Sequence, residues 1–109
     1  MLYLSNRQYV MEYHIKLVYA KKDKTVGNHK VEFGMGIARS TRKRYFYYHG
    51  NCVCVVDDID KTFELNACGW GGSRSTKDCL AGYRKLLESI GYKELNPKPI
   101  YNYEYKNKM

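Results

Sequence analysis

The residues that decide the fold run from Ser75 to Ile90, with the sequence STKDCLAGYRKLLESI. Ser75 suits the N-cap position of a helix, and Asp78 three residues later completes a short version of the capping box. Gly91 stands where glycine commonly ends a helix. Apolar side chains at helical spacing form one stripe between these signals: Cys79, Leu80, Tyr83, Leu86, Leu87 and Ile90. The sequence therefore predicts a helix over 75–90 that covers one face of a sheet.

Upstream of this helix, apolar and polar side chains alternate, which is typical of half-buried strands. Long strands are predicted over 9–20 and 30–38, where Gly34 and Gly36 would together cost a helix about 2 kcal/mol. Shorter strands are predicted over 44–48, 52–56 and 62–67. The predicted fold class is α+β, with an antiparallel sheet of four or five strands and one C-terminal helix packed across one face.

Turn residues separate the predicted strands. His49-Gly50-Asn51 is typical of a tight turn, with Gly50 at a positive φ angle. Asp57–Lys61 forms an acidic turn. We expect residues 1–95 to form a single domain and residues 96–109 to form a Pro- and Tyr-rich tail.

Charge is unevenly distributed along the 109 residues, whose formal net charge is +8. Residues 1–50 carry ten Lys or Arg against three Asp or Glu, whereas residues 51–109 carry nine against eight. A basic half suggests a surface that attracts anions, most commonly nucleic acid, although many small proteins are basic only for solubility. The 12 tyrosines suit half-buried strands and interfaces.

No stretch approaches the ~20 apolar residues of a membrane span, and Met1–Gln8 lacks the apolar core of a signal peptide. We therefore expect a cytoplasmic protein without a membrane partner, in which all four cysteines are reduced thiols. Cys52 and Cys54 would share one face of a strand and meet Cys79 in the core as small hydrophobic residues. Their spacing does not match a zinc knuckle.

Residue types suited to catalysis are scattered over the predicted elements. His14, His29 and His49 fall on a strand, a turn and a hairpin tip, and no Ser or Cys lies in a nucleophile motif. Three aspartates in the 57–61 turn could hold a divalent cation, but such a turn is more commonly a solvated hairpin. We expect neither enzymatic activity, nor a bound metal, nor a cofactor.

The strongest candidate binding site combines cations with aromatic rings on and around the 44–48 strand. Cations neutralise phosphates and tyrosine rings stack on bases, which is how single strands are held without strict sequence readout. The same mixture describes a protein-interface hot spot or a solvated basic loop. The partner-binding candidates are Arg39, Arg42, Lys43, Arg44, Tyr45, Tyr47 and His49.

A second candidate site lies at the start of the predicted 75–90 helix, where a glycine-rich turn precedes it. Backbone N–H groups at a helix N-terminus favour an anion such as a phosphate. The alternative is that the glycines only turn a strand into a helix. The anion-binding candidates are Gly71, Gly72, Ser73, Arg74, Ser75 and Lys77.

Three segments carry a resemblance to known sequences: His49-Gly50-Asn51, Glu64-Leu65-Asn66-Ala67-Cys68-Gly69-Trp70 and Ser75-Thr76-Lys77-Asp78. Over roughly residues 45–92 the chain resembles small uncharacterised proteins of tailed bacteriophages. In these a strand ends in Gly-Trp or Gly-Tyr and a Ser/Thr-Thr-Lys cap opens a helix. The chain departs from this pattern at Gly71-Gly72, which lengthens the junction, and at Cys79-Leu80-Ala81. The resemblance implies a phage-like origin and a bacterial host cell, but no mechanism.

A looser likeness links the glycine-rich turn and its Ser- and Lys-rich continuation to the last helix of double-stranded RNA-binding domains. The strand predicted over 9–20 leaves no leading helix for such a domain. Two functions therefore stand beside each other. The first is inhibition of a host protein or nucleoprotein machine, such as a defence complex, in an anti-CRISPR-like manner. The second is direct binding of RNA or DNA through the basic, Tyr-rich surface.

Overall fold

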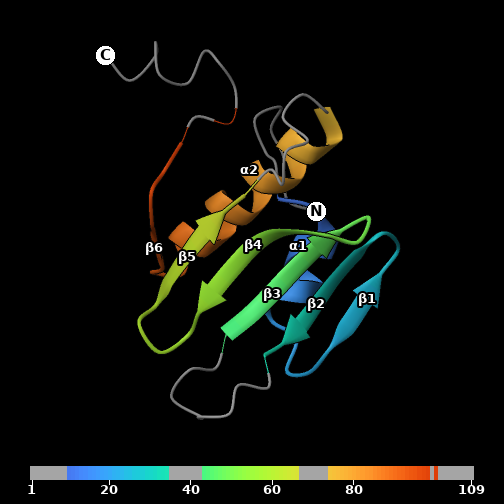
Figure 1. The fold of residues 1–109 in the computed structure, drawn as a ribbon, viewed down its shortest axis with the longest axis horizontal. Helices are drawn as coiled ribbons and strands as arrows, with labels where there is room; N and C mark the ends of the chain where they lie inside the picture. Colours follow the sequence, from blue (N-terminus) through green and yellow to red (C-terminus); the bar gives the residue numbers. More distant parts are fainter. Residues whose placement is uncertain (1–9, 35–42, 67–73, 99, 101–109) are drawn as a thin grey trace.

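The computed structural model describes residues 10–34, 43–66, 74–98 and 100. Within them the chain forms an α+β fold of two helices and six strands (Figure 1). The elements are α1 (Glu12–Val18), β1 (Lys24–Val26), β2 (His29–Phe33), β3 (Lys43–Tyr48), β4 (Asn51–Asp57), β5 (Thr62–Leu65), α2 (Arg74–Ser89) and β6 (Lys93–Glu94).

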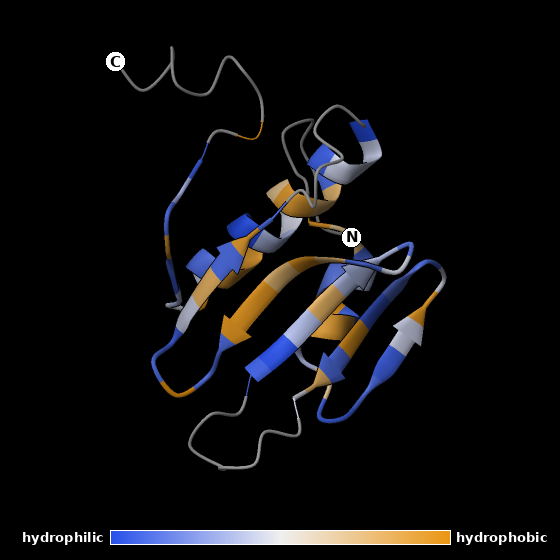
Figure 2. Ribbon diagram, in the orientation of Figure 1, coloured by the Kyte–Doolittle hydropathy of each residue, from blue (hydrophilic) through white to orange (hydrophobic). Residues whose placement is uncertain are grey.

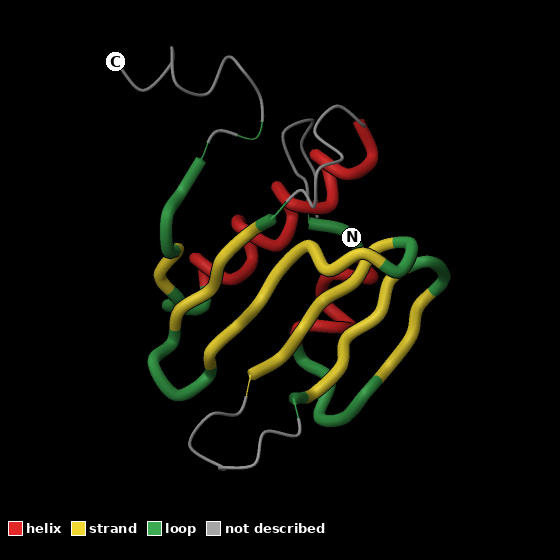
Figure 3. The backbone as a smooth tube through the Cα atoms, in the orientation of Figure 1, coloured by secondary structure: helices red, strands yellow, loops and turns green. Residues whose placement is uncertain are grey.

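The six strands form one sheet in which spatial order follows chain order from β1 to β6. Neighbouring strands are antiparallel except β5 and β6, which are parallel, so the sheet is mixed. Both helices pack on the same side of the sheet (Figures 1 and 3). The described part of the chain therefore has two layers, with helices over one sheet face and no described element over the other.

The strand predicted over 9–20 is wrong, because α1 occupies this segment. Alternating apolar residues suggested a strand, yet the side chains that α1 buries are His14, Leu17 and Val18, which are spaced as on a helix. The His14 ring also caps the helix, since Nδ1 accepts a hydrogen bond of 2.9 Å from the Met11 N–H. The chain therefore does have a helix before its first strand. The predicted lack of such a helix was the argument against a likeness to double-stranded RNA-binding domains, and that argument does not hold.

The predicted α+β fold with a largely antiparallel sheet is confirmed. The number of strands and the direction of the last strand differ from the prediction. The structure adds β1 before the Gly27-Asn28 turn, and β6 returns beside β5 after α2. Both are short strands, and such strands carry little periodicity in sequence. The predicted extension of the 30–38 strand beyond residue 34 lies outside the described residues.

Helix α2 confirms the central prediction. Its stripe is buried at Cys79, Leu80, Tyr83 and Leu87, and Leu86 is partly buried. The prediction is wrong at Ile90, which lies past the end of α2 and is 38% exposed. Gly91 has a φ angle of +99°, and the following Tyr92 N–H donates to the Leu87 carbonyl at 3.0 Å, which closes the helix C-terminus. The N-cap assignment is wrong, since the helix begins at Arg74 and the Ser75 hydroxyl accepts a hydrogen bond from Tyr48 at 3.0 Å.

A bulge in the pairing of β3 with β4 places Cys52 and Cys54 on different faces of the sheet. The register shifts between Phe46 and Tyr47, so Cys54 lies opposite Phe46 on the core side while Cys52 lies opposite Tyr47 on the other side. The prediction that Cys52 and Cys54 share a face is therefore wrong. Cys54 is buried in the same core as Cys79, and burial raises the pKa of the Cys79 thiol to about 12. These two thiols stay protonated at neutral pH.

We expect Tyr83→Phe to leave stability unchanged or to raise it. Tyr83 is fully buried, and its hydroxyl has no hydrogen-bond partner among the described residues. An unpaired buried hydroxyl costs about 1–3 kcal/mol, whereas the ring itself packs against Phe46 and His14. Urea unfolding compares the variant with its parent. A loss above about 1 kcal/mol would mean that the hydroxyl has a bonded partner, such as a buried water.

Candidate functional site

The sheet face opposite the helices displays side chains from five neighbouring strands. In β3 the buried and half-buried residues alternate, so Lys43, Tyr45 and Tyr47 point away from the core. Strand pairing places further side chains beside them in rows across the sheet. We call this surface the open face, formed by Thr25, Lys30, Glu32, Lys43, Tyr45, Tyr47, Cys52, Val55, Asp57, Thr62 and Glu64.

The centre of the open face is tyrosine and aliphatic surface. Tyr45 lies between Glu32 on β2 and Val55 on β4, and Glu64 follows Val55 on β5. Tyr47 lies in the next row, beside Lys30. Both tyrosines are half-buried, so their rings are partly immobilised by neighbours while remaining accessible. Such rings add contact area to an interface at little further loss of side-chain entropy.

Charged groups around Tyr47 are already paired with each other. The Lys30 ammonium lies 2.9 Å from the Glu32 carboxylate and 5.2 Å from the centre of the Tyr47 ring. Partial burial, together with the nearby Glu32 carboxylate, raises the pKa of Tyr47. The Tyr47 hydroxyl is hydrogen-bonded to the Glu32 side chain, so Tyr47 offers a partner its ring rather than a free hydroxyl.

Taken together with the adjoining Lys93 on β6, the open face carries no net charge. Its lysines are Lys30 and Lys43 and its acids are Glu32, Asp57 and Glu64, and Lys93 on β6 adjoins the last row and balances them. The excess positive charge of the protein therefore lies elsewhere. A phosphate chain crossing the face would meet as many carboxylates as ammonium groups.

Among the predicted partner-binding residues, the structure brings together Lys43, Tyr45 and Tyr47 on the open face. Arg39 and Arg42 lie outside the described residues. His49 sits at the exposed tip of the β3–β4 hairpin with a φ angle of 52°, at the opposite end of β3 from Lys43. The described members of the predicted partner-binding set therefore do not form one patch.

Arg44, a predicted partner-binding residue, lies on the helix side of the sheet rather than on the open face. It belongs to β3, and its side chain is 8% exposed and turns to the helix side. Its Nε and Nη2 groups each donate to the Asp58 carboxylate at 2.7 Å, and Nη1 donates to the Val18 carbonyl. Tyr92 donates to the same carboxylate at 2.6 Å. Arg44 thus joins α1, β3 and the β4–β5 turn and is not offered to a partner.

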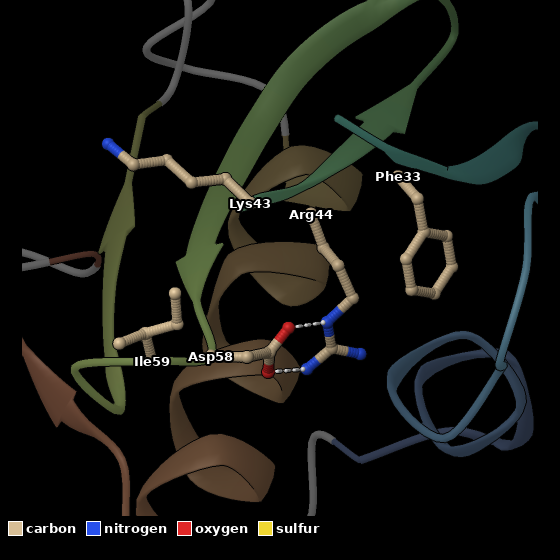
Figure 4. Close-up of a pocket in the computed structure, with 5 residues that line it drawn as sticks. All are labelled: Phe33, Lys43, Arg44, Asp58 and Ile59. Atoms are coloured by element: carbon tan, nitrogen blue, oxygen red, sulfur yellow. Dashed lines mark hydrogen bonds and ion pairs between the residues drawn. The ribbon is translucent and has the colours of Figure 1, made fainter. Parts of the chain in front are cut away.

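A hollow of about 340 Å³ lies above this ion pair (Figure 4). Phe33 and Ile59 stand on either side of the Arg44–Asp58 pair, and the Lys43 side chain extends away from it (Figure 4). Because the guanidinium and carboxylate already satisfy each other, the ion pair in this hollow offers no unpaired charge to a ligand.

At the predicted anion site, the described residues give little support for a bound anion. Arg74 is 86% exposed in its side chain and lies 3.8 Å from Asp78, one turn further along α2. Ser75 faces Tyr48. Gly71, Gly72 and Ser73 lie outside the described residues, so the predicted glycine-rich turn stays a prediction.

Sequence reasoning missed that residues distant in the chain converge near the start of α2. The Tyr13 ring stacks on His29 at 3.6 Å, and His29 stacks on Tyr48 at 4.7 Å. The Cys79 sulfur lies 3.9 Å from His29 Nδ1, but Cys79 is fully buried. No substrate can reach this thiol in the folded state. No local sequence pattern predicts this cluster of Tyr13, His29, Tyr48 and Cys79, because it depends on the packing of α1 against α2.

We expect stability to fall as the pH drops from about 6.5 towards 4, because burial lowers the pKa of His14 to about 4. His14 is fully buried, and its Nε2–H donates to the Cys79 carbonyl at 3.0 Å, so only the neutral ring fits. The unfolded chain binds the proton first, which removes about 3 kcal/mol across this range. Urea unfolding at several pH values measures it.

His14→Gln is the matched variant, because glutamine keeps a donor for the Cys79 carbonyl but cannot bind a proton. It should flatten the stability curve between pH 4 and 6.5. An unchanged slope in the variant would mean that other groups cause the acid sensitivity.

The comparisons with known proteins add no relative to this geometry: no protein family matches the sequence, and no similar curated protein or solved structure was found. The described segments contain no helix with the length and apolar character needed to cross a membrane. Within the same segments, no three His, Cys, Asp or Glu side chains are grouped as a metal site would require.

Proposed function

We propose that this protein is a non-enzymatic binding protein that docks its open face on the protein part of a host nucleoprotein machine and thereby inhibits it. The observation that carries the proposal is the combination of two half-buried tyrosines with balanced charge on a sheet face that no described helix covers. Tyrosine enrichment and charge balance are features of protein interfaces.

The charge balance separates a protein partner from a nucleic-acid partner at this face. Glu32, Asp57 and Glu64 would repel phosphates, and the Lys30 ammonium is already paired with Glu32. A protein surface can supply groups of both signs opposite these side chains. The open face therefore fits a protein contact better than a phosphate track.

The inhibitory role rests on size and on the sequence resemblance. A single small domain whose described residues offer binding surface acts by occupying a partner's surface. The likeness to tailed-bacteriophage proteins supports a target in the bacterial cytoplasm, such as a defence complex, in an anti-CRISPR-like manner. Direct binding of RNA or DNA is the second candidate, and the net charge of +8 favours it.

The experiment that tests the proposal is capture from a bacterial lysate with the tagged protein, with and without nuclease. We expect a defined protein to remain bound after nuclease treatment and to be lost when Tyr45 and Tyr47 are both replaced by Thr. Threonine keeps strand propensity while removing the rings. Loss of every captured protein on nuclease treatment would instead favour direct nucleic-acid binding.

A further inference from the structure

The turn between α1 and β1 is a concentration of unpaired positive charge. Lys21, Lys22 and Lys24 are all exposed. Within the described segments none of them forms an ion pair, unlike Lys16, Lys30 and Arg84 elsewhere in the chain. Figure 2 shows the part of this connection that leads into β1 as hydrophilic.

Asp23, the only acid in this turn, binds the protein's own backbone. Its Oδ1 accepts a hydrogen bond of 2.9 Å from the Phe33 N–H at the end of β2. This bond ties the turn to the end of β2. The next residue, Gly34, donates to the Lys43 carbonyl at 2.6 Å, so the turn lies at the sheet end where β3 begins. Arg39 and Arg42 belong to the sequence that joins β2 to β3.

The acidic β4–β5 turn does not cancel this charge. Strand β4 is three strand positions from β1, about 14 Å across the sheet, and Asp58 approaches the end of α1 through Arg44, which donates to the Val18 carbonyl. Salt screens exposed charges over about 8 Å at physiological ionic strength. In addition, Asp58 is neutralised by Arg44. The Lys21–Lys24 turn therefore acts as a separate cationic surface.

We propose that the Lys21–Lys24 turn is a nucleic-acid contact that binds the phosphate backbone without reading sequence. Exposed lysines on a turn anchored to the sheet neutralise phosphates as point charges and release counterions. The site is separate from the open face and does not depend on it. Both surfaces together fit a partner that presents protein and nucleic acid side by side.

The test is fluorescence anisotropy with a labelled oligothymidine of about twenty nucleotides, measured over a range of salt concentrations. Lys21→Gln, Lys22→Gln and Lys24→Gln in one variant should weaken binding about tenfold or more at low salt. The slope of log affinity against log salt should become shallower by about 2, since each contact with a single strand contributes about 0.7. Thermal unfolding verifies that the variant is folded.

The matched control replaces Lys61, Lys85 and Lys98, which are also exposed, with Gln. It makes the same change in net charge and should retain most of the affinity. An equal loss in both variants would reduce the effect to net charge and overturn the proposal. A loss caused only by Tyr45→Thr with Tyr47→Thr would place the nucleic acid on the open face and also overturn it. Tighter binding of a polyglutamate peptide of equal charge would assign the turn to an acidic protein instead.

Discussion

Leu80→Asp is expected to unfold the domain at room temperature. Leu80 is 6% exposed and belongs to the buried stripe of α2 that packs on the sheet. The replacement removes apolar burial worth about 2–5 kcal/mol and leaves a carboxylate without a partner in the core. The sum is comparable to the whole stability of a domain of this size, about 5–15 kcal/mol. Loss of near-ultraviolet circular dichroism measures the effect.

Lys85→Asp is the control, because it introduces a carboxylate on the exposed side of the same helix. This variant should fold and lose no more than about 1 kcal/mol. If Leu80→Asp kept the stability of its parent, the face of α2 that packs on the sheet would be wrongly assigned.

Asp58→Ala is expected to lower the free energy of unfolding by about 3 kcal/mol. The Arg44 side chain is 8% exposed, and without Asp58 its guanidinium would be a buried cation with no carboxylate, held by the Val18 carbonyl and the faces of neighbouring rings. The Asp58 side chain is 39% exposed, so water can partly replace it. Tyr92 also loses its acceptor. Urea unfolding gives the value.

Two comparisons sharpen this test. Asp60→Ala removes the same charge from the same turn, at an exposed side chain, and should cost little. Adding Arg44→Met to Asp58→Ala removes the buried cation that has lost its carboxylate, and should recover part of the lost free energy of unfolding. Equal losses for Asp58→Ala and Asp60→Ala would show that the ion pair adds nothing to stability.

The elements with strong periodicity were predictable from the sequence. The stripe of α2 and the alternation of β3 to β5 gave the fold class and placed Tyr45 and Tyr47 on one face. Helix α1 was not predictable in this way, because its alternating apolar residues match a strand while its buried residues match a helix. Only the packing of His14 against Cys79 on α2 decides between them.

Arg44 shows a signal that the sequence did contain. Arg44, Phe46 and Tyr48 share one phase of the β3 alternation, so an arginine in this phase points into the core. A buried arginine requires a carboxylate, and the aspartates of the following turn supply it. The charge balance of the open face was not predictable, because it depends on which residues of β2, β4 and β5 lie beside β3.

The central claim is that the open face is the surface that contacts a protein partner, and the affinity of tyrosine variants for the captured partner tests it most directly. Tyr45→Thr and Tyr47→Thr should each weaken binding by about 2 kcal/mol or more, an effect that persists at high salt. Tyr19→Thr is the matched control, since Tyr19 is 55% exposed at the end of α1, away from the open face, and should bind like the parent. Parental affinity in the folded Tyr45→Thr and Tyr47→Thr variants would contradict the account.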